Sequence, residues 1–185
     1  LILSDMYMEY RKAHEQIMCQ VPQVVQDVAD EFRRISGRSY GLFESYRLED
    51  AEVAIVVMSS AAGTTKDVID QYRDKGIRAG LLKPRLYRPF PYTKIGLALK
   101  HVKAVAVLDR SDSFGGSCGP LFLDITAALS CQTERPVLVN KIFGLGGRDY
   151  MPEQARQVLD ELLQLAQGAP VTSLKQYIGV REAAC

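Results

Sequence analysis

The chain has 185 residues, of which 47% are hydrophobic and 24% are charged, and its formal net charge is +1. This length suits one domain with an appendage, and the hydrophobic content is sufficient for one core. The near-neutral charge gives no electrostatic reason to expect nucleic acid or a membrane surface as a partner, so we expect neither.

The cysteines and histidines are too scattered to suggest a metal site. No CxxC pair occurs among Cys19, Cys118, Cys131 and Cys185, and His14 and His101 lie far apart. Zinc and iron–sulfur sites need clustered ligands, so we expect no metal in this segment. Scattered cysteines are typical of reduced thiols in the cytoplasm. No apolar stretch approaches the roughly 20 residues of a membrane span, and no signal-peptide pattern is present.

The first residues, from about 5 to 35, have apolar positions at helical spacing. Pro22 interrupts them, which predicts two helices or one kinked helix ending near Gly37. An irregular linker rich in tyrosine and arginine then runs over residues 38–50. We therefore expect a helical lead-in and linker over residues 1–50. A start at Leu1 rather than methionine suggests a fragment of a longer protein.

From Glu52 onward, short apolar runs alternate with amphipathic segments. Strands are predicted at 53–58, 77–82, 104–108 and 137–142. The run at 53–58 is continuous rather than alternating, which is typical of a strand covered on both faces. Helical segments separate the strands, and a last helix is predicted from 152 to about 166. The pattern predicts an α/β fold over 51–167 with three layers, a mainly parallel sheet between helices. Residues 168–185 form a polar tail whose apolar piece, 177–180, is either an edge strand or disordered.

Two glycine-rich loops, at 109–120 and 144–149, each follow a predicted strand. Together with the loops at 59–65 and 85–91, they emerge at the carboxyl edge of a parallel sheet, where such sheets bind ligands or partners. Four arginines reach this edge, at positions 85, 88, 110 and 148, and could hold a phosphate or carboxylate. Pairing with Asp112, Asp149 or a neighbouring domain is the favoured alternative. The candidate interface or anion-binding residues are Arg85, Arg88, Arg110, Gly146, Gly147, Arg148 and Asp149.

Neither glycine loop matches a nucleotide-binding fingerprint. The second loop lacks the GxGxxG spacing, and no P-loop lysine–serine pair occurs. Residues 59–64 resemble a phosphate loop in composition, but a tight turn with Thr64 or Thr65 as helix N-cap is favoured.

No catalytic or cofactor-binding constellation is predicted within the segment. Cys118 could be a nucleophile, but a buried small residue is the better interpretation. Asp109 could act in acid–base chemistry, although an aspartate there more often caps the following turn. His101 is most simply a residue that interacts with carbonyls at a helix end.

Several short motifs, taken together and in order, resemble one protein family. They are GRSYG at 37–41, YRLEDAE at 46–52, RPFP at 88–91, VLDR at 107–110, GPL at 119–121 and GLGGRD at 144–149. As an ordered set covering about residues 5–167, they resemble the second domain of pyruvate:ferredoxin oxidoreductase. In the multi-subunit enzymes of that family, this domain is the C-terminal part of the alpha subunit.

The resemblance implies a fold like the C-terminal domain of transketolase. It also implies a parent enzyme that oxidatively decarboxylates a 2-oxoacid to an acyl-CoA and passes electrons to ferredoxin. Thiamine diphosphate, magnesium, iron–sulfur clusters and coenzyme A are implied for that parent, whereas this segment has no GDG motif with paired asparagines and no cysteine cluster. The RPFP and GLGGRD motifs favour the pyruvate branch. The loop at 111–118 departs from the family pattern, and the resemblance gives it no role.

We therefore expect a structural and assembly domain that is not catalytic alone, with the other domains and subunits as partners and ferredoxin reached through the complex. The alternative is a stand-alone α/β module that binds an anion such as coenzyme A on the arginine rim. A nucleotide-dependent dehydrogenase is disfavoured by the glycine spacing.

Overall fold

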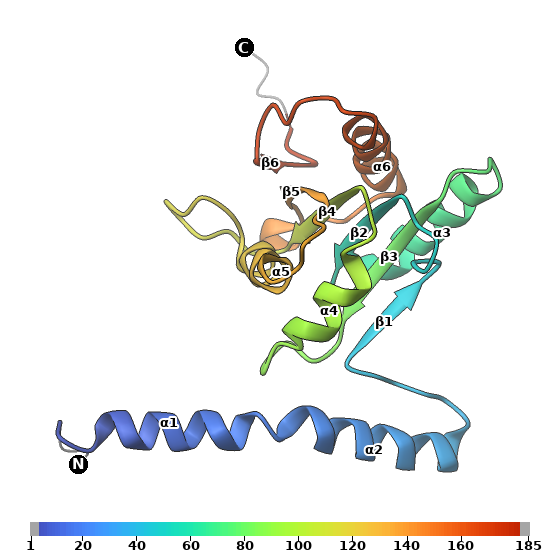
Figure 1. Ribbon diagram of the computed structural model, residues 1–185. Coiled ribbons are helices and arrows are strands. Elements are labelled where there is room, and N and C mark those ends of the chain that lie inside the picture. Colours follow the sequence, from blue (N-terminus) through green and yellow to red (C-terminus); the bar gives the residue numbers. More distant parts are fainter. Residues whose placement is uncertain (1–3, 182–185) are drawn as a thin grey trace. The chain divides into compact units, whose positions relative to one another are not determined.

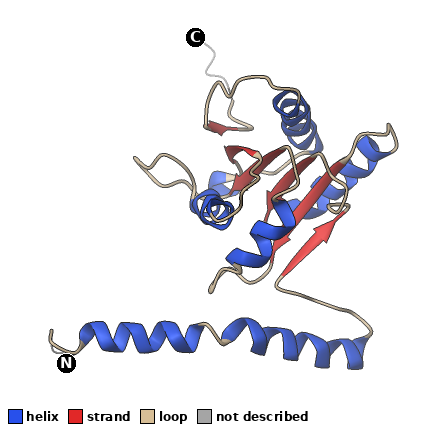
Figure 2. Ribbon diagram, viewed as in Figure 1, coloured by secondary structure: helices blue, strands red, loops and turns tan. Residues whose placement is uncertain are grey.

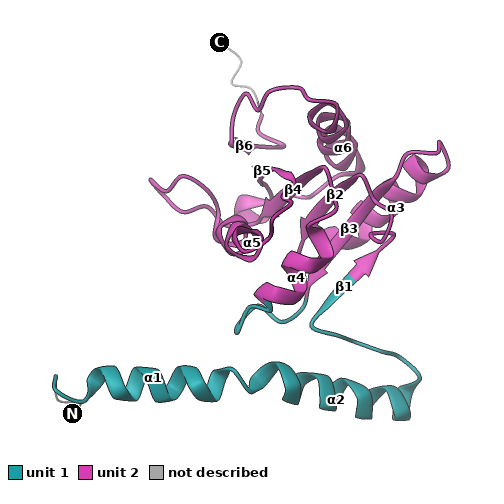
Figure 3. Cartoon of the chain, viewed as in Figure 1, with its two compact units in different colours: residues 1–44, 85–91 teal, residues 45–84, 92–185 magenta. Residues whose placement is uncertain are grey.

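A computed structural model describes residues 4–181, so Leu1 and Cys185 lie outside the described residues. The chain divides into two compact units (Figure 3). Unit 1 comprises Leu1–Glu44 and Arg85–Pro91, and unit 2 comprises Ser45–Pro84 and Tyr92–Cys185. Each unit is described by itself.

Unit 1 contains two helices, α1 (Tyr7–Met18) and α2 (Val21–Ser36). Pro22 lies in the first turn of α2, where its missing N–H leaves no intrahelical hydrogen bond unmade. Gly37 ends α2 in the left-handed conformation, with φ of 73°, and its N–H donates to the carbonyl of Arg33. The predicted interruption at Pro22 and the helix end near Gly37 are both confirmed.

The sheet has six strands (Figure 2). They are β1 (Phe43–Tyr46), β2 (Val53–Val57), β3 (Ala79–Pro84), β4 (Ala104–Asp109), β5 (Val137–Ile142) and β6 (Lys175–Tyr177), in the order β1-β3-β2-β4-β5-β6. Every pairing from β3 to β6 is parallel, and Val53 lies between Ala79 and Ala104 in register. All five residues of β2 are buried, as expected for a continuous apolar run in the middle of a covered sheet.

Helices cover both faces of this sheet (Figure 1). Helices α3 (Ala61–Arg73) and α6 (Pro152–Ala166) pack on each other over one face, and α4 (Tyr92–Leu99) and α5 (Pro120–Ser130) pack on each other over the opposite face. Alternate residues of β2, such as Ile55, belong to one apolar cluster with Val68 of α3 and Leu159 of α6. The predicted three-layer α/β fold is confirmed.

Three details differ from the expectation. Strand β1 lies within the segment predicted as an irregular linker. It was not predicted because its sequence, FESY, contains no apolar run. Strand β3 begins two residues later than predicted, at Ala79. The second glycine loop contains a short 3₁₀ turn, η1 (Leu145–Gly147). In the tail, β6 is one of the two edge strands of the sheet, and it overlaps the predicted piece, 177–180, only at Tyr177.

Candidate functional site at the carboxyl edge of the sheet

Strands β2, β4 and β5 are parallel and in register, so the loops that follow them lie together at one edge of the sheet, within unit 2. The first loop turns sharply into α3 through Ser59, whose φ of 60° is uncommon for a residue other than glycine. The second loop joins β4 to α5, and the third joins β5 to α6.

A buried polar network holds the loop after β4 to the sheet. The Asp109 carboxylate accepts hydrogen bonds from the backbone N–H groups of Leu121 and Phe122, at 2.8 and 3.1 Å, and from the Asn140 side chain at 2.9 Å. Asn140 also donates to the carbonyl of Val107, and its side-chain oxygen accepts from the Gly119 N–H at 2.8 Å. Asp109 therefore caps the first turn of α5, as the sequence favoured.

Burial raises the pKa of Asp109, although the hydrogen bonds from α5 and Asn140 act in the opposite direction. The first turn of α5 also lies so close to Asp109 that a Cβ added at Gly119 would collide with the carboxyl group. The side chain is buried and these donors occupy its oxygens, so Asp109 fixes the loop after β4 to the first turn of α5.

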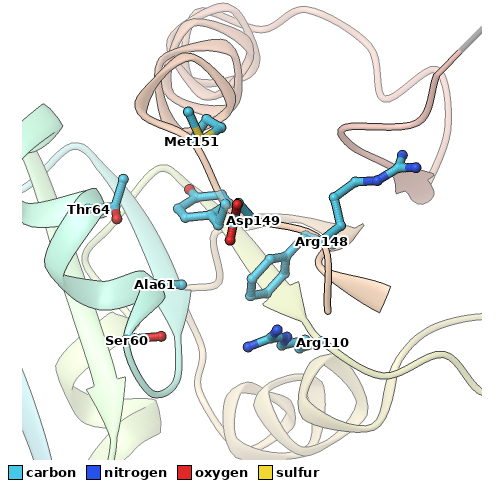
Figure 4. A pocket seen from close by; sticks show the side chains of 9 residues that line it. Ser60, Ala61, Thr64, Arg110, Arg148, Asp149 and Met151 are labelled. Atoms are coloured by element: carbon cyan, nitrogen blue, oxygen red, sulfur yellow. The ribbon is translucent and has the colours of Figure 1, made fainter. Parts of the chain in front are cut away.

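A cleft of about 280 Å³ lies at this edge, between the start of α3 and the loop before α6 (Figure 4). Its lining combines hydroxyl, charged and aromatic side chains: Ser60, Ala61, Thr64, Arg110, Phe143, Arg148, Asp149, Tyr150 and Met151. The Tyr150 hydroxyl lies 3.5 Å from that of Thr65, and burial raises the pKa of Tyr150 to about 12. Tyr150 therefore stays protonated at neutral pH, and its hydroxyl can donate a hydrogen bond.

The two arginines of the cleft differ in direction. The Arg110 side chain donates through Nε to the carbonyl of Gly144, at 3.2 Å, and lies across from Ser60 (Figure 4). The Arg148 side chain instead extends away from Ser60 and donates to the carbonyl of Gly179 in the tail. Of the two, Arg110 is therefore the arginine whose side chain faces the start of α3, and Asp149 also lines the cleft.

The other two predicted arginines belong to unit 1. Arg85 pairs with Glu44 at 2.5 Å, and its guanidinium lies 4.5 Å from the centre of the Tyr40 ring. Arg88 stacks on Tyr87 at 4.0 Å. Since Arg110 and Arg148 belong to unit 2, a common rim of four arginines stays a prediction.

Gly146 and Gly147 have φ of 66° and 80° and are exposed, so the second loop holds a backbone conformation that other residues adopt poorly. Their proposed role, and that of Asp149, likewise stays a prediction.

The middle of the first glycine loop is held by the tail. Lys175 of β6 donates to the Asp112 carboxylate at 3.1 Å and to the carbonyl of Gly116 at 2.9 Å. The Tyr177 hydroxyl donates to the other oxygen of Asp112. These hydrogen bonds, Tyr177 first and Lys175 second, lower the pKa of Asp112. We call Asp112, Gly116, Lys175 and Tyr177 the Asp112 network.

Smaller predictions had mixed outcomes. Cys118 is buried, as expected, and burial raises the pKa of its thiol. The expectation of a threonine N-cap was wrong: α3 begins after Ser60, and Thr65 donates from within the helix to the carbonyl of Ala61. The expectation for His101 was also wrong, because its Nε2 lies 3.0 Å from the carbonyl of Leu48, which is outside any helix.

The sequence did not predict Asn140, nor Lys175 and Tyr177 as partners of Asp112, for which an arginine was the expected partner. Asn140 had a usable signal, since an amide inside a predicted strand of a covered sheet needs a buried partner. Lys175 and Tyr177 had no such signal, because the tail shows no pattern that places it beside residues 60 positions earlier.

Within residues 4–181, no group of three or more His, Cys, Asp or Glu side chains is arranged to hold a metal ion. The described side chains therefore offer no cluster of carboxylates that fits a magnesium ion and no cluster of cysteines that fits an iron–sulfur cluster. No described helix is both long and apolar enough to cross a membrane.

Residues 51–155 match the family model described as pyruvate:ferredoxin oxidoreductase core domain II. The chain is 37% identical, over 98% of its length, to pyruvate synthase subunit PorA of Thermotoga maritima, and it covers 45% of that subunit. It is 41% identical over 84% of its length to PorA of Methanothermobacter thermautotrophicus, and it covers 39% of it. The chain thus spans less than half the length of these curated relatives.

The fold also resembles a solved structure, the 2-oxoglutarate:ferredoxin oxidoreductase from Magnetococcus marinus with 2-oxoglutarate, coenzyme A and succinyl-CoA bound. The TM-score is 0.53 at 23% identity, and the match covers 66% of this chain and 20% of that one. At this identity, the likeness supports the fold alone.

Proposed function

The chain belongs to the pyruvate:ferredoxin oxidoreductase core domain II family, and on this premise we propose that it is a supporting and assembly domain of a 2-oxoacid:ferredoxin oxidoreductase. The family match over residues 51–155 carries the proposal. The Thermotoga and Methanothermobacter relatives are PorA subunits of pyruvate synthase. Pyruvate is therefore the proposed 2-oxoacid.

The proposed parent enzyme decarboxylates the 2-oxoacid oxidatively, transfers the acyl group to coenzyme A and passes the electrons to ferredoxin. Thiamine diphosphate, magnesium and iron–sulfur clusters are proposed for its other parts, since the donors described here fit none of the metals. The partners are the other domains and subunits, and ferredoxin is reached through them. The proposed location is the cytoplasm, which suits the free thiols of Cys19, Cys118 and Cys131.

This chain contributes ordered loops at the carboxyl edge of its sheet, on which other parts of the enzyme dock. The Asp109 and Asn140 hydrogen bonds fix one end of the loop after β4, and the Asp112 network fixes its middle. A surface whose loops are already ordered loses little conformational entropy when it binds a partner. We propose that Arg110, Gly146, Gly147, Arg148 and Asp149 contact neighbouring parts of the enzyme, with Arg85 and Arg88 of unit 1 as further contact candidates.

A stand-alone module that binds the phosphates of coenzyme A is the second candidate, because Arg110 faces a cleft with hydroxyl groups. Arg148 and Asp149 weigh against it. The guanidinium of Arg148 is engaged by the tail, and the carboxylate of Asp149 would repel a phosphate. Titration calorimetry of the chain with millimolar coenzyme A tests this candidate: we expect no heat beyond dilution, whereas saturable heat that Arg110→Ala abolishes would establish it.

The main proposal is tested by depletion in the source cells. We expect extracts depleted of the chain to lose pyruvate- and coenzyme A-dependent reduction of ferredoxin, and re-expression to restore it. Undiminished activity in depleted extracts would contradict the proposal.

A further inference from the structure

Phe114 is the most exposed large apolar side chain of the described residues, with a relative exposure of 104%. It lies in the loop between β4 and α5 (Figure 1), next to Gly115, whose φ is 74°. The Gly116 N–H donates to the carbonyl of Ser113 at 2.8 Å, and this hydrogen bond closes a four-residue turn in which Phe114 is the second residue. The ring therefore contacts water at the tip of a turn, where an aromatic side chain gains nothing for folding.

The turn is held in place from several sides. Lys175 donates to the carbonyl of Gly116 and to Asp112, and Tyr177 donates to Asp112. Beyond the turn, Cys118 is buried and the Gly119 N–H is bound by Asn140. An exposed aromatic ring on an ordered turn differs from one on an unattached segment, since its position is set before any partner arrives.

We infer that Phe114 is an aromatic anchor that inserts into an apolar pocket on another protein part of the parent oxidoreductase. This rests on the proposed function. Aromatic residues dominate the binding energy of protein interfaces when their rings enter desolvated pockets. The chain covers 45% of its Thermotoga relative, so such a parent holds further protein that could supply the pocket. The loop carries no cluster of basic side chains, and this favours a protein partner over an anionic membrane.

The inference is tested in the complete parent protein inside its source cells, with the photo-cross-linking residue p-benzoylphenylalanine replacing Phe114. A second strain carries the same replacement at Leu97, a half-exposed apolar residue of α4. After irradiation, cross-linked peptides are identified by mass spectrometry. We expect position 114 to cross-link to apolar residues outside residues 1–185 of this chain. Cross-links confined to residues 1–185, including those from a second copy, or to lipid, would overturn the inference.

A dissociation measurement complements the cross-linking. We expect Phe114→Ala, introduced into the complete parent protein, to raise the dissociation constant of its complex with the subunit that position 114 cross-links about thirtyfold, as the loss of an anchor residue does, and Leu97→Ala to leave it within a factor of about three. An unchanged constant for Phe114→Ala would also overturn the inference. Thermal unfolding of both variants checks whether the fold is retained.

The two proposals can fail separately. A position-114 cross-link to another protein in a complex that does not reduce ferredoxin would reject the proposed function and keep the anchor. An active complex without that cross-link would keep the proposed function and reject the anchor.

Discussion

At the residue scale, Asp109 is the side chain on which the shape of the candidate site depends most. It joins the end of β4 to the first turn of α5 and to Asn140 of β5. Asp109→Ala leaves the backbone N–H groups of Leu121 and Phe122 without this acceptor and removes one of the two hydrogen bonds that the Asn140 amide donates. We therefore expect a loss of about 2–4 kcal/mol in the free energy of unfolding. Urea unfolding measures it. Asp149→Ala is the matched control, because Asp149 is exposed, and we expect a change within about 0.5 kcal/mol. Equal effects of the two variants would contradict the capping role.

Asp112 makes the stability depend on pH in a defined direction. Its pKa in the folded chain is lowered from the usual 3.8 by the hydrogen bonds from Tyr177 and Lys175. The stabilisation is therefore present above pH 3.8 and is lost as the pH falls through the lowered folded-state pKa. We expect Asp112→Asn to be less stable than the wild type at pH 7 and the difference to shrink in acid.

Urea unfolding of both proteins at pH 7 and below pH 3.8 checks this. Asp109 is identical in the two proteins, so its own titration cancels from the comparison. A difference that stays constant with pH would show that the ionised Asp112 network contributes nothing.

At the element scale, two helical glycines distinguish close packing from open surface. A Cβ at Gly96 of α4 would collide with the carbonyl of Ala128 in α5, whereas one at Gly63 of α3 meets no atom within 4 Å. We expect Gly96→Ala to destabilise the fold by about 1–3 kcal/mol through overpacking. Gly63→Ala should stabilise it by about 0.5–1 kcal/mol through helix propensity. Thermal unfolding of both variants checks the pair, and a stabilising Gly96→Ala would mean that α4 and α5 do not approach so closely.

The elements also show how far a sequence predicts this fold. A continuous apolar run predicted β2, because a strand covered on both faces has no polar side. Strand β1 was missed because its sequence FESY has no such run, and its role comes from its place at an edge. The direction of the Arg148 side chain could not be predicted from the sequence either, since its acceptor is a backbone carbonyl 31 residues further along the chain. Local pattern predicts elements, whereas long-range polar contacts need the structure.

At the scale of the whole molecule, the features of unit 2 agree with one another as parts of a docking domain. The edge loops are fixed by buried or paired polar groups, Phe114 faces solvent, and no described set of side chains suits a metal. The ordered edge loops and the exposed ring of Phe114 are the features on which the proposed docking role rests.

The most direct test of the central claim, that this chain works within a larger oxidoreductase, is native affinity purification through a tag on its parent gene. We predict that the tagged protein elutes with iron–sulfur clusters and thiamine diphosphate and reduces ferredoxin when pyruvate and coenzyme A are both supplied. A tagged protein that elutes as a single polypeptide, without these cofactors and without pyruvate-dependent reduction of ferredoxin, would contradict the claim.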